Sequence, residues 1–136
     1  NYDAVAAFQK KTSELSRRTS IAGRQLGEAG NKLRHIKAAL TNTPAATPEL
    51  YNTLVTLNKT LFNLRTTLNG DRTRQSKDVS TSPSIGSRIG NVIYGHWETT
   101  ELPTETQKQN IEIAQTDFDK YLLEAASFFN DILLFL

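Results

Sequence analysis

The sequence contains no cysteine and no methionine. Without cysteine there is no disulfide scaffold, no thiolate ligand for zinc or an iron–sulfur cluster, and no thiol nucleophile. Every apolar run is shorter than the roughly 18 residues of a membrane span, and the polar N-terminus lacks a signal-peptide pattern. Because position 1 is asparagine, we expect a processed product or a piece of a longer protein.

Length and composition predict one folded domain over residues 1–136. Hydrophobic residues make up 38% of the chain and charged residues 22%, which permits one core but not two. No fixed repeat or alternating strand pattern is present. Apolar residues instead recur at intervals of three and four, the spacing that places side chains along one side of a helix.

The first predicted helix runs from Val5 to Leu40. Its apolar side has small residues in the middle, and three glycines there lower helix propensity by about 1 kcal/mol each. The stretch could therefore bend or admit a close neighbour. Pro44 ends the pattern, because proline disfavours helical geometry at the preceding residue.

The second predicted helix starts with Thr47 as N-cap and Pro48 at the first helical position, and it stops at Asn69-Gly70. Leucines at intervals of four and three form its apolar side: Leu50, Leu54, Leu57, Leu61, Leu64 and Leu68. The short connection after the first helix favours an antiparallel hairpin.

Residues 71–82 are almost entirely polar and are predicted to form an exposed connection. A short third helix is expected from Pro83 to Gly95, with Ser82 as its cap. A loop follows over 96–103. Thr104 and Gln107 then have the spacing of a capping box that opens a last helix, which extends to the C-terminus.

These elements predict an all-α fold, an antiparallel helical bundle of three long helices and one short helix. The last helix is expected to be central, because its final turns, over 128–136, are apolar on nearly every side.

Charge is unevenly distributed along the chain. Residues 1–95 carry 14 Lys or Arg against 6 Asp or Glu, whereas residues 96–136 carry 2 against 8. One interpretation is a polyanion-binding surface, with Arg72, Arg74, Lys77 and Arg88 as its contacts. The favoured interpretation is an acidic last helix packed among basic neighbours, and no nucleic-acid partner is expected.

Chemistry-bearing patterns are sparse. No spacing places two histidines on one helix face, so no metal or cofactor is expected. His96, Trp97 and Glu98 could form a small polar loop pocket, or the core of a small hydrolase, although Trp97 more often closes the end of a helical core. No catalytic residue is predicted.

The segment Pro83-Ser84-Ile85-Gly86-Ser87-Arg88-Ile89, the later Tyr94-Gly95 and the helix start Pro103-Thr104-Glu105-Thr106-Gln107 resemble the C-terminal region of bacterial sortilin-related proteins. These are Vps10-like proteins with BNR repeats, often labelled glycosyl hydrolases. The resemblance covers roughly residues 80–120. It implies an extracytoplasmic helical region that follows β-propeller domains, and it implies no activity for this region alone.

The C-terminal residues form the predicted interaction surface: Phe128, Phe129, Leu133, Phe135 and Leu136. They could be enclosed within the domain, self-associate, or contact the remainder of the parent protein or another protein. The leading hypothesis is a non-enzymatic structural or interaction domain. A polyanion-binding module and an accessory domain of a glycan-active enzyme are the alternatives.

Overall fold

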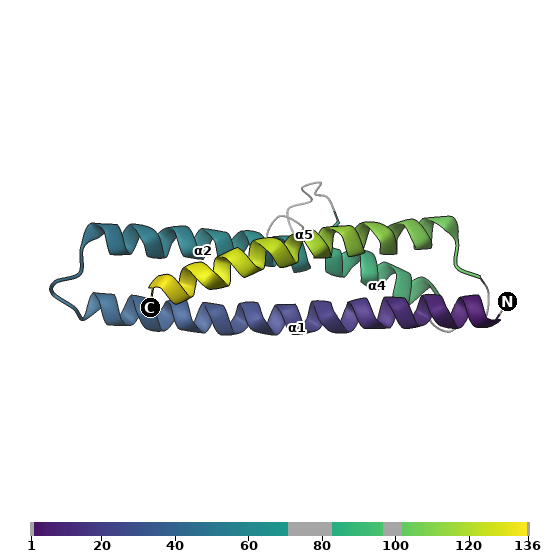
Figure 1. Cartoon of the computed structure of the whole chain (residues 1–136), viewed down its shortest axis with the longest axis horizontal. Helices are drawn as coiled ribbons and strands as arrows, with labels where there is room; N and C mark the ends of the chain where they lie inside the picture. The colour runs from purple at the N-terminus through teal and green to yellow at the C-terminus, as the bar shows by residue number, and fades with distance from the viewer. Residues whose placement is uncertain (1, 71–82, 97–101, 136) are drawn as a thin grey trace.

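The computed structural model describes residues 2–70, 83–96 and 102–135, and these residues form helices and no strands (Figure 1). The helices are α1 (Tyr2–Thr41), α2 (Pro48–Asn69), α4 (Ile85–His96) and α5 (Glu105–Phe135). The all-α prediction is confirmed for this part of the chain. The predicted connection over 71–82 lies outside the described residues.

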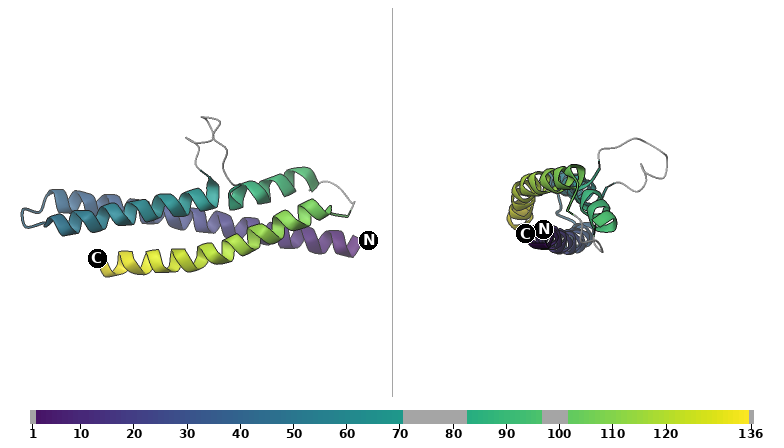
Figure 2. Two further views of the ribbon diagram at one scale, coloured as in Figure 1. Left: turned by 90° about the horizontal axis from the view of Figure 1, so that it is seen from above. Right: turned by 90° about the vertical axis from the view of Figure 1, so that its right-hand side faces the viewer.

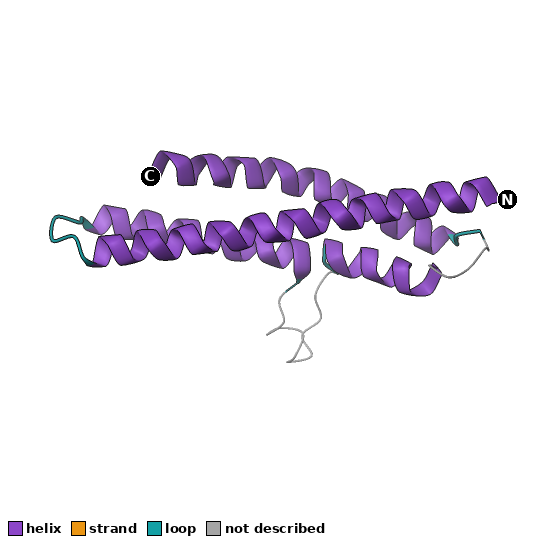
Figure 3. Ribbon diagram, turned by 90° about the horizontal axis from the view of Figure 1, so that it is seen from below, coloured by secondary structure: helices purple, strands orange, loops and turns teal. Residues whose placement is uncertain are grey.

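Helix α1 is the longest element, with 40 residues and a length of about 60 Å. Helix α2 returns antiparallel to it, and α4 continues in the direction of α2 beyond its end (Figures 1 and 2). Helix α5 runs back in the direction of α1 and packs on α4 and α2. Seen from below, α2 and α4 lie in succession along one side of α1 (Figure 3).

The intervals of three and four determine what is buried. In α1 the predicted apolar side is buried from Val5 to Leu33, and in α2 five of its six leucines are buried. In α5 the same spacing is buried from Ile111 to Ile132. This pattern is typical of helices that pack side by side with a small crossing angle.

The predicted ends of α2 are confirmed. The Leu50 N–H donates to the Thr47 hydroxyl oxygen at 3.4 Å, and Pro48 occupies the first turn. At the other end Gly70 has a φ of 84°, and its N–H donates to the Thr66 carbonyl at 2.8 Å. Glycine adopts this left-handed conformation without the strain that a Cβ introduces.

The capping box of α5 is confirmed as well. The Gln107 N–H donates to the Thr104 hydroxyl at 3.1 Å, and the Thr104 N–H donates to the Gln107 side-chain oxygen at 2.9 Å. Each residue thereby satisfies a backbone donor that the first helical turn leaves without an intrahelical partner.

The predicted start of the short helix is wrong by two residues. Helix α4 begins at Ile85, and its N-cap is Ser84, whose hydroxyl accepts from the Ser87 N–H at 3.1 Å. Pro83 therefore precedes the helix. Ser84 is buried against the core, and Ser82, the predicted cap, lies outside the described residues. The helix also extends past Gly95 to His96.

Helix α5 is not central, contrary to expectation. It forms one side of the assembly, and its outward side is exposed at Leu123, Leu133 and Leu134. The reason is that α1 and α2 pack directly against each other, so α5 lies alongside this pair and not between its helices (Figure 2).

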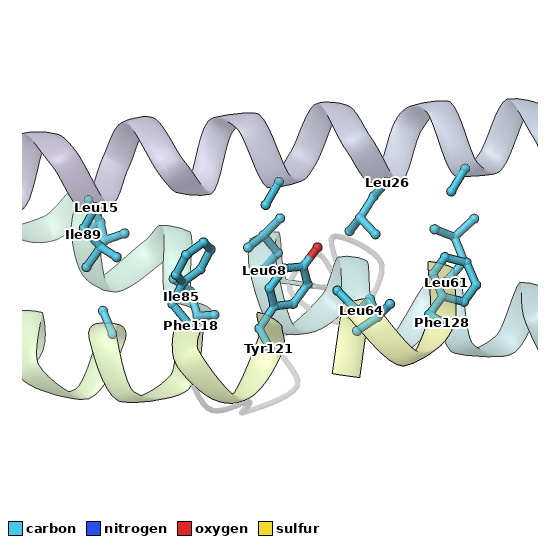
Figure 4. Packing of buried hydrophobic residues seen from close by; sticks show 14 of the residues in the cluster. Leu15, Leu26, Leu61, Leu64, Leu68, Ile85, Ile89, Phe118, Tyr121 and Phe128 are labelled. Carbon is cyan, nitrogen blue, oxygen red and sulfur yellow. The ribbon is translucent and has the colours of Figure 1, made fainter. Parts of the chain in front are cut away.

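The end of α2 meets the start of α4 over a cluster of large side chains. Leu68, Ile85, Phe118 and Tyr121 are all buried and converge there (Figure 4). The Phe118 and Tyr121 rings stack with centroids 5.8 Å apart. This cluster, the α2–α4 junction, is where three helices share core residues.

Tyr121 brings a hydroxyl group into this junction. The residue is 1% exposed, and its hydroxyl has no hydrogen-bond partner among the described residues. Burial raises the pKa of Tyr121 to about 12, because desolvation disfavours the charged phenolate. The neutral form is therefore the one that the fold accommodates.

This burial predicts a loss of stability in alkali. Folding raises the pKa of Tyr121 from 10 to about 12. Below pH 10 the tyrosine is neutral in both states, and as the pH rises from 10 to about 12 only the unfolded state gives up the proton, so the free energy of unfolding falls. We expect the free energy of unfolding to fall by about 2 to 3 kcal/mol over that range. Urea unfolding of the wild type and of Tyr121→Phe at neutral and alkaline pH measures this.

Tyr121→Phe should lack this alkaline loss and should be as stable as the wild type at neutral pH, or more stable by up to about 1 kcal/mol. A Tyr121→Phe protein that loses as much stability in alkali as the wild type would contradict the assignment.

Candidate interaction surface

Several predicted site residues lie outside the described part of the chain. They are Arg72, Arg74, Lys77, Trp97, Glu98 and Leu136. His96 is the last residue of α4, and the structure describes its backbone alone. The predicted polar loop pocket and three of the four predicted polyanion contacts therefore remain predictions.

Arg88, the fourth predicted polyanion contact, is engaged within the fold. Its guanidinium donates from Nη1 to the Asn110 side-chain oxygen at 2.9 Å, which ties α4 to α5. Its Nε is buried and has no partner among the described residues. A guanidinium held between two helices is poorly placed to contact an external polyanion.

Side-chain electrostatics does not explain how the basic and acidic parts of the chain pack. In the described part of the chain the ion pairs are Arg17–Glu14 at 2.6 Å and Lys108–Glu105 at 3.7 Å, each within one helix. Arg17 holds the pKa of the Glu14 carboxyl below its ordinary value by hydrogen bonding and by its charge. Neither ion pair joins two helices, so packing between the helices depends mainly on apolar burial.

Metal-ligating side chains do not converge either. Among the described residues, no group of three His, Asp or Glu side chains is placed to hold a metal ion. His35 is exposed on α1.

Helix α5 carries two different rows of apolar side chains. The inner row continues the interval of three and four and is buried; in its last turns it contains Ala125, Phe128 and Ile132. Phe128 was predicted as an interaction residue, and the structure places it in the core with 1% of its surface exposed. Phe135, at the end of this row, is partly buried.

The second row, here called the outer row, consists of Leu122, Ala126, Phe129 and Leu133. The intervals are four, three and four, which again place the side chains along one side of the helix. Leu122, Ala126 and Leu133 are exposed, and Phe129 is partly buried beside Phe128. Leu123 and Leu134, next to the row, are 76% and 79% exposed.

The outer row lies on a helix face without charge. Between residues 121 and 135 the charged residues are Glu124 and Asp131. They are seven residues apart, so they share one side of the helix, which is neither that of the inner row nor that of the outer row. The outer row spans about three turns, and an uncharged apolar face of this length is more typical of an interface than of a solvated helix surface.

The predicted interaction residues include Phe129 and Leu133 but leave out Leu122, Leu123 and Ala126. They also combine Phe128, a residue of the inner row, with Phe129 and Leu133, although the intervals in the sequence separate the two rows. Once Ala125, Phe128 and Ile132 are assigned to the core by continuing the intervals from Ile111, the remaining apolar residues fall into a second row.

The described surface has two other features. Helix α2 exposes Val55 and Phe62 beside Lys59 over a shallow depression of about 440 Å³. Between α1 and α4 a groove of about 390 Å³ is lined by small residues such as Ser20, Gly23 and Gly90. Neither contains a cluster of ionisable groups.

No family model, no curated protein and no solved structure matches this chain. None of the described helices is long and apolar enough to cross a membrane.

Proposed function

We propose that the chain is a non-enzymatic structural or interaction domain that binds another protein chain through the outer row of α5. In this proposal it folds as an antiparallel bundle of three long helices and one short one. The observation that carries the proposal is the exposed, uncharged face around Leu122 and Leu133, which is apolar where a solvated helix would be polar.

The sequence resemblance suggests the setting. The helix start at Ser84-Ile85 and the capping box at Thr104 belong to the segment that resembles sortilin-related proteins, and both are used as helix caps here. We propose that the domain belongs to a larger exported protein with β-propeller repeats, either packing on it or projecting from it.

The test uses the chain and the separately produced remainder of the parent protein. Titration calorimetry should show binding by the wild type and binding at least about tenfold weaker for Leu133→Glu. Phe62→Glu changes another exposed apolar position, on α2, and is the control that should bind as the wild type does; Phe62 is 55% exposed and Leu133 is 66% exposed. If the wild type does not bind, or if Phe62→Glu weakens binding as much as Leu133→Glu, this setting is wrong.

A further inference from the structure

The outer row has an order that makes it complementary to itself. The row begins and ends with leucine, and its two middle positions hold one small and one large residue. In chain order these are Leu122, Ala126, Phe129 and Leu133. If a second copy runs antiparallel along it, Leu122 lies opposite the partner's Leu133, and Ala126 lies opposite the partner's Phe129. Each large ring then faces a methyl group, the small-against-large packing that two close helices need.

We propose that this face binds a second copy of the same chain, as a symmetric antiparallel pair of α5 helices. This rests on the proposed function, and it names the partner. A twofold axis between Ala126 and Phe129 makes the two contacts at each end identical, which is the condition for a closed dimer.

Charge is compatible with this pairing. A helix with several carboxylates would repel a second copy if those groups met, yet Glu124 and Asp131 lie away from the outer row. Leu123, Ser127, Asn130 and Leu134 border the row on its outward side, and all are uncharged. The two paired α5 helices therefore bring no like charges of their own together along these three turns.

The exposed area sets the strength of the pairing. Leu123, Leu133 and Leu134 are each more than 60% exposed, at 76%, 66% and 79%. Two copies packed along this face would bury on the order of 1,000 Å², at the lower end of specific protein interfaces. We therefore expect a weak dimer, with a dissociation constant of about 1 μM or higher.

Sedimentation equilibrium of the whole chain, from about 10 μM to about 1 mM, tests the assembly. We expect a monomer that converts to a dimer and forms nothing larger. A monomer at every concentration, or growth beyond the dimer, would overturn the proposal, because an asymmetric contact does not close.

Charge pairs test the register. Leu122→Lys and Leu133→Glu should each raise the dissociation constant at least about tenfold. A chain that carries both changes should regain most of the lost affinity, because the introduced lysine of one copy would face the introduced glutamate of the other. A parallel pair would place like charges together and give no recovery. Phe62→Glu is the control and should leave the dimer unchanged.

Disulfide trapping gives a second measurement that does not depend on charges at apolar positions. The chain has no cysteine of its own. Mixing Leu122→Cys with Leu133→Cys should give a crosslinked heterodimer under mild oxidation, whereas either variant alone should stay largely monomeric. Equal crosslinking of each variant alone would overturn the antiparallel register.

The two proposals fail in different ways. A chain that remains monomeric but binds the remainder of its parent through Leu133 retains the proposed function and loses the dimer. A chain that dimerises in this register but does not bind the parent retains the dimer and loses the proposed setting.

Discussion

Phe118→Ala is expected to lower the free energy of unfolding by about 3 to 5 kcal/mol. Phe118 is 1% exposed at the α2–α4 junction, where its ring stacks on Tyr121 and contacts the inner side chains (Figure 4). The Arg18 guanidinium lies 6.0 Å above the same ring, so α1 contributes a cation–π contact as well. Truncation leaves a cavity that three helices surround and cannot collapse easily.

Phe62→Ala provides the matched control. It is the same substitution in a helix of the same protein, but Phe62 is 55% exposed on α2. We expect a change within about 0.5 kcal/mol. Urea unfolding monitored by circular dichroism measures both variants. Equal losses for Phe118→Ala and Phe62→Ala would show that the α2–α4 junction is not the packed centre of the fold.

Helix positions and ends were predictable from the sequence because they depend on local interactions. The caps at Thr47, Gly70 and Thr104 each involve groups within four residues of one another. The buried sides of the long helices follow from the intervals between apolar residues, which need no knowledge of the partner helix.

The arrangement of the helices was predictable only in part, because it depends on distant contacts. The placement of α4 beyond the end of α2 rests on packing between Leu68 and Ile85 with α5, and no spacing in the sequence encodes it (Figure 4). The expected central position of the last helix failed for the same reason. Its final turns are apolar on two sides, but only one of those sides faces α1 and α2.

Assigning the residues of α5 to the core or to the surface requires the exact intervals between its apolar residues. Phe128 and Phe129 are adjacent and chemically identical, yet one is core and the other borders an exposed face. Neighbouring residues on a helix point about 100° apart, so composition alone cannot separate them. Continuing the interval from Tyr121 assigns Phe128 to the core, and the outer row then follows.

Two glycines of α4, Gly86 and Gly90, differ in how closely other parts of the chain approach them. A Cβ added at Gly86 would lie 3.0 Å from the Leu68 carbonyl oxygen and 3.4 Å from the Asn69 side-chain oxygen. A Cβ at Gly90 would meet nothing within 4 Å. The close approach of α4 to α2 therefore needs glycine at position 86 and does not need it at position 90.

Gly86→Ala and Gly90→Ala should consequently change stability in opposite directions. Alanine favours a helix interior by about 1 kcal/mol over glycine, which Gly90→Ala should gain almost in full. At Gly86, in the first turn of α4, any such gain is opposed by the tight contact of the new Cβ with the Leu68 carbonyl, which cannot rotate away as a side chain can. We expect a net loss of about 1 to 3 kcal/mol.

Urea unfolding of both variants measures this difference directly, because the two sites share a helix and a substitution. Gly86→Ala should also weaken the junction as a unit, since moving α4 away from Leu68 uncovers Ile85 and Phe118 together. If Gly86→Ala stabilises the chain as much as Gly90→Ala, α4 does not press on the end of α2. The two helices would then be held in line only by their separate contacts with α1 and α5.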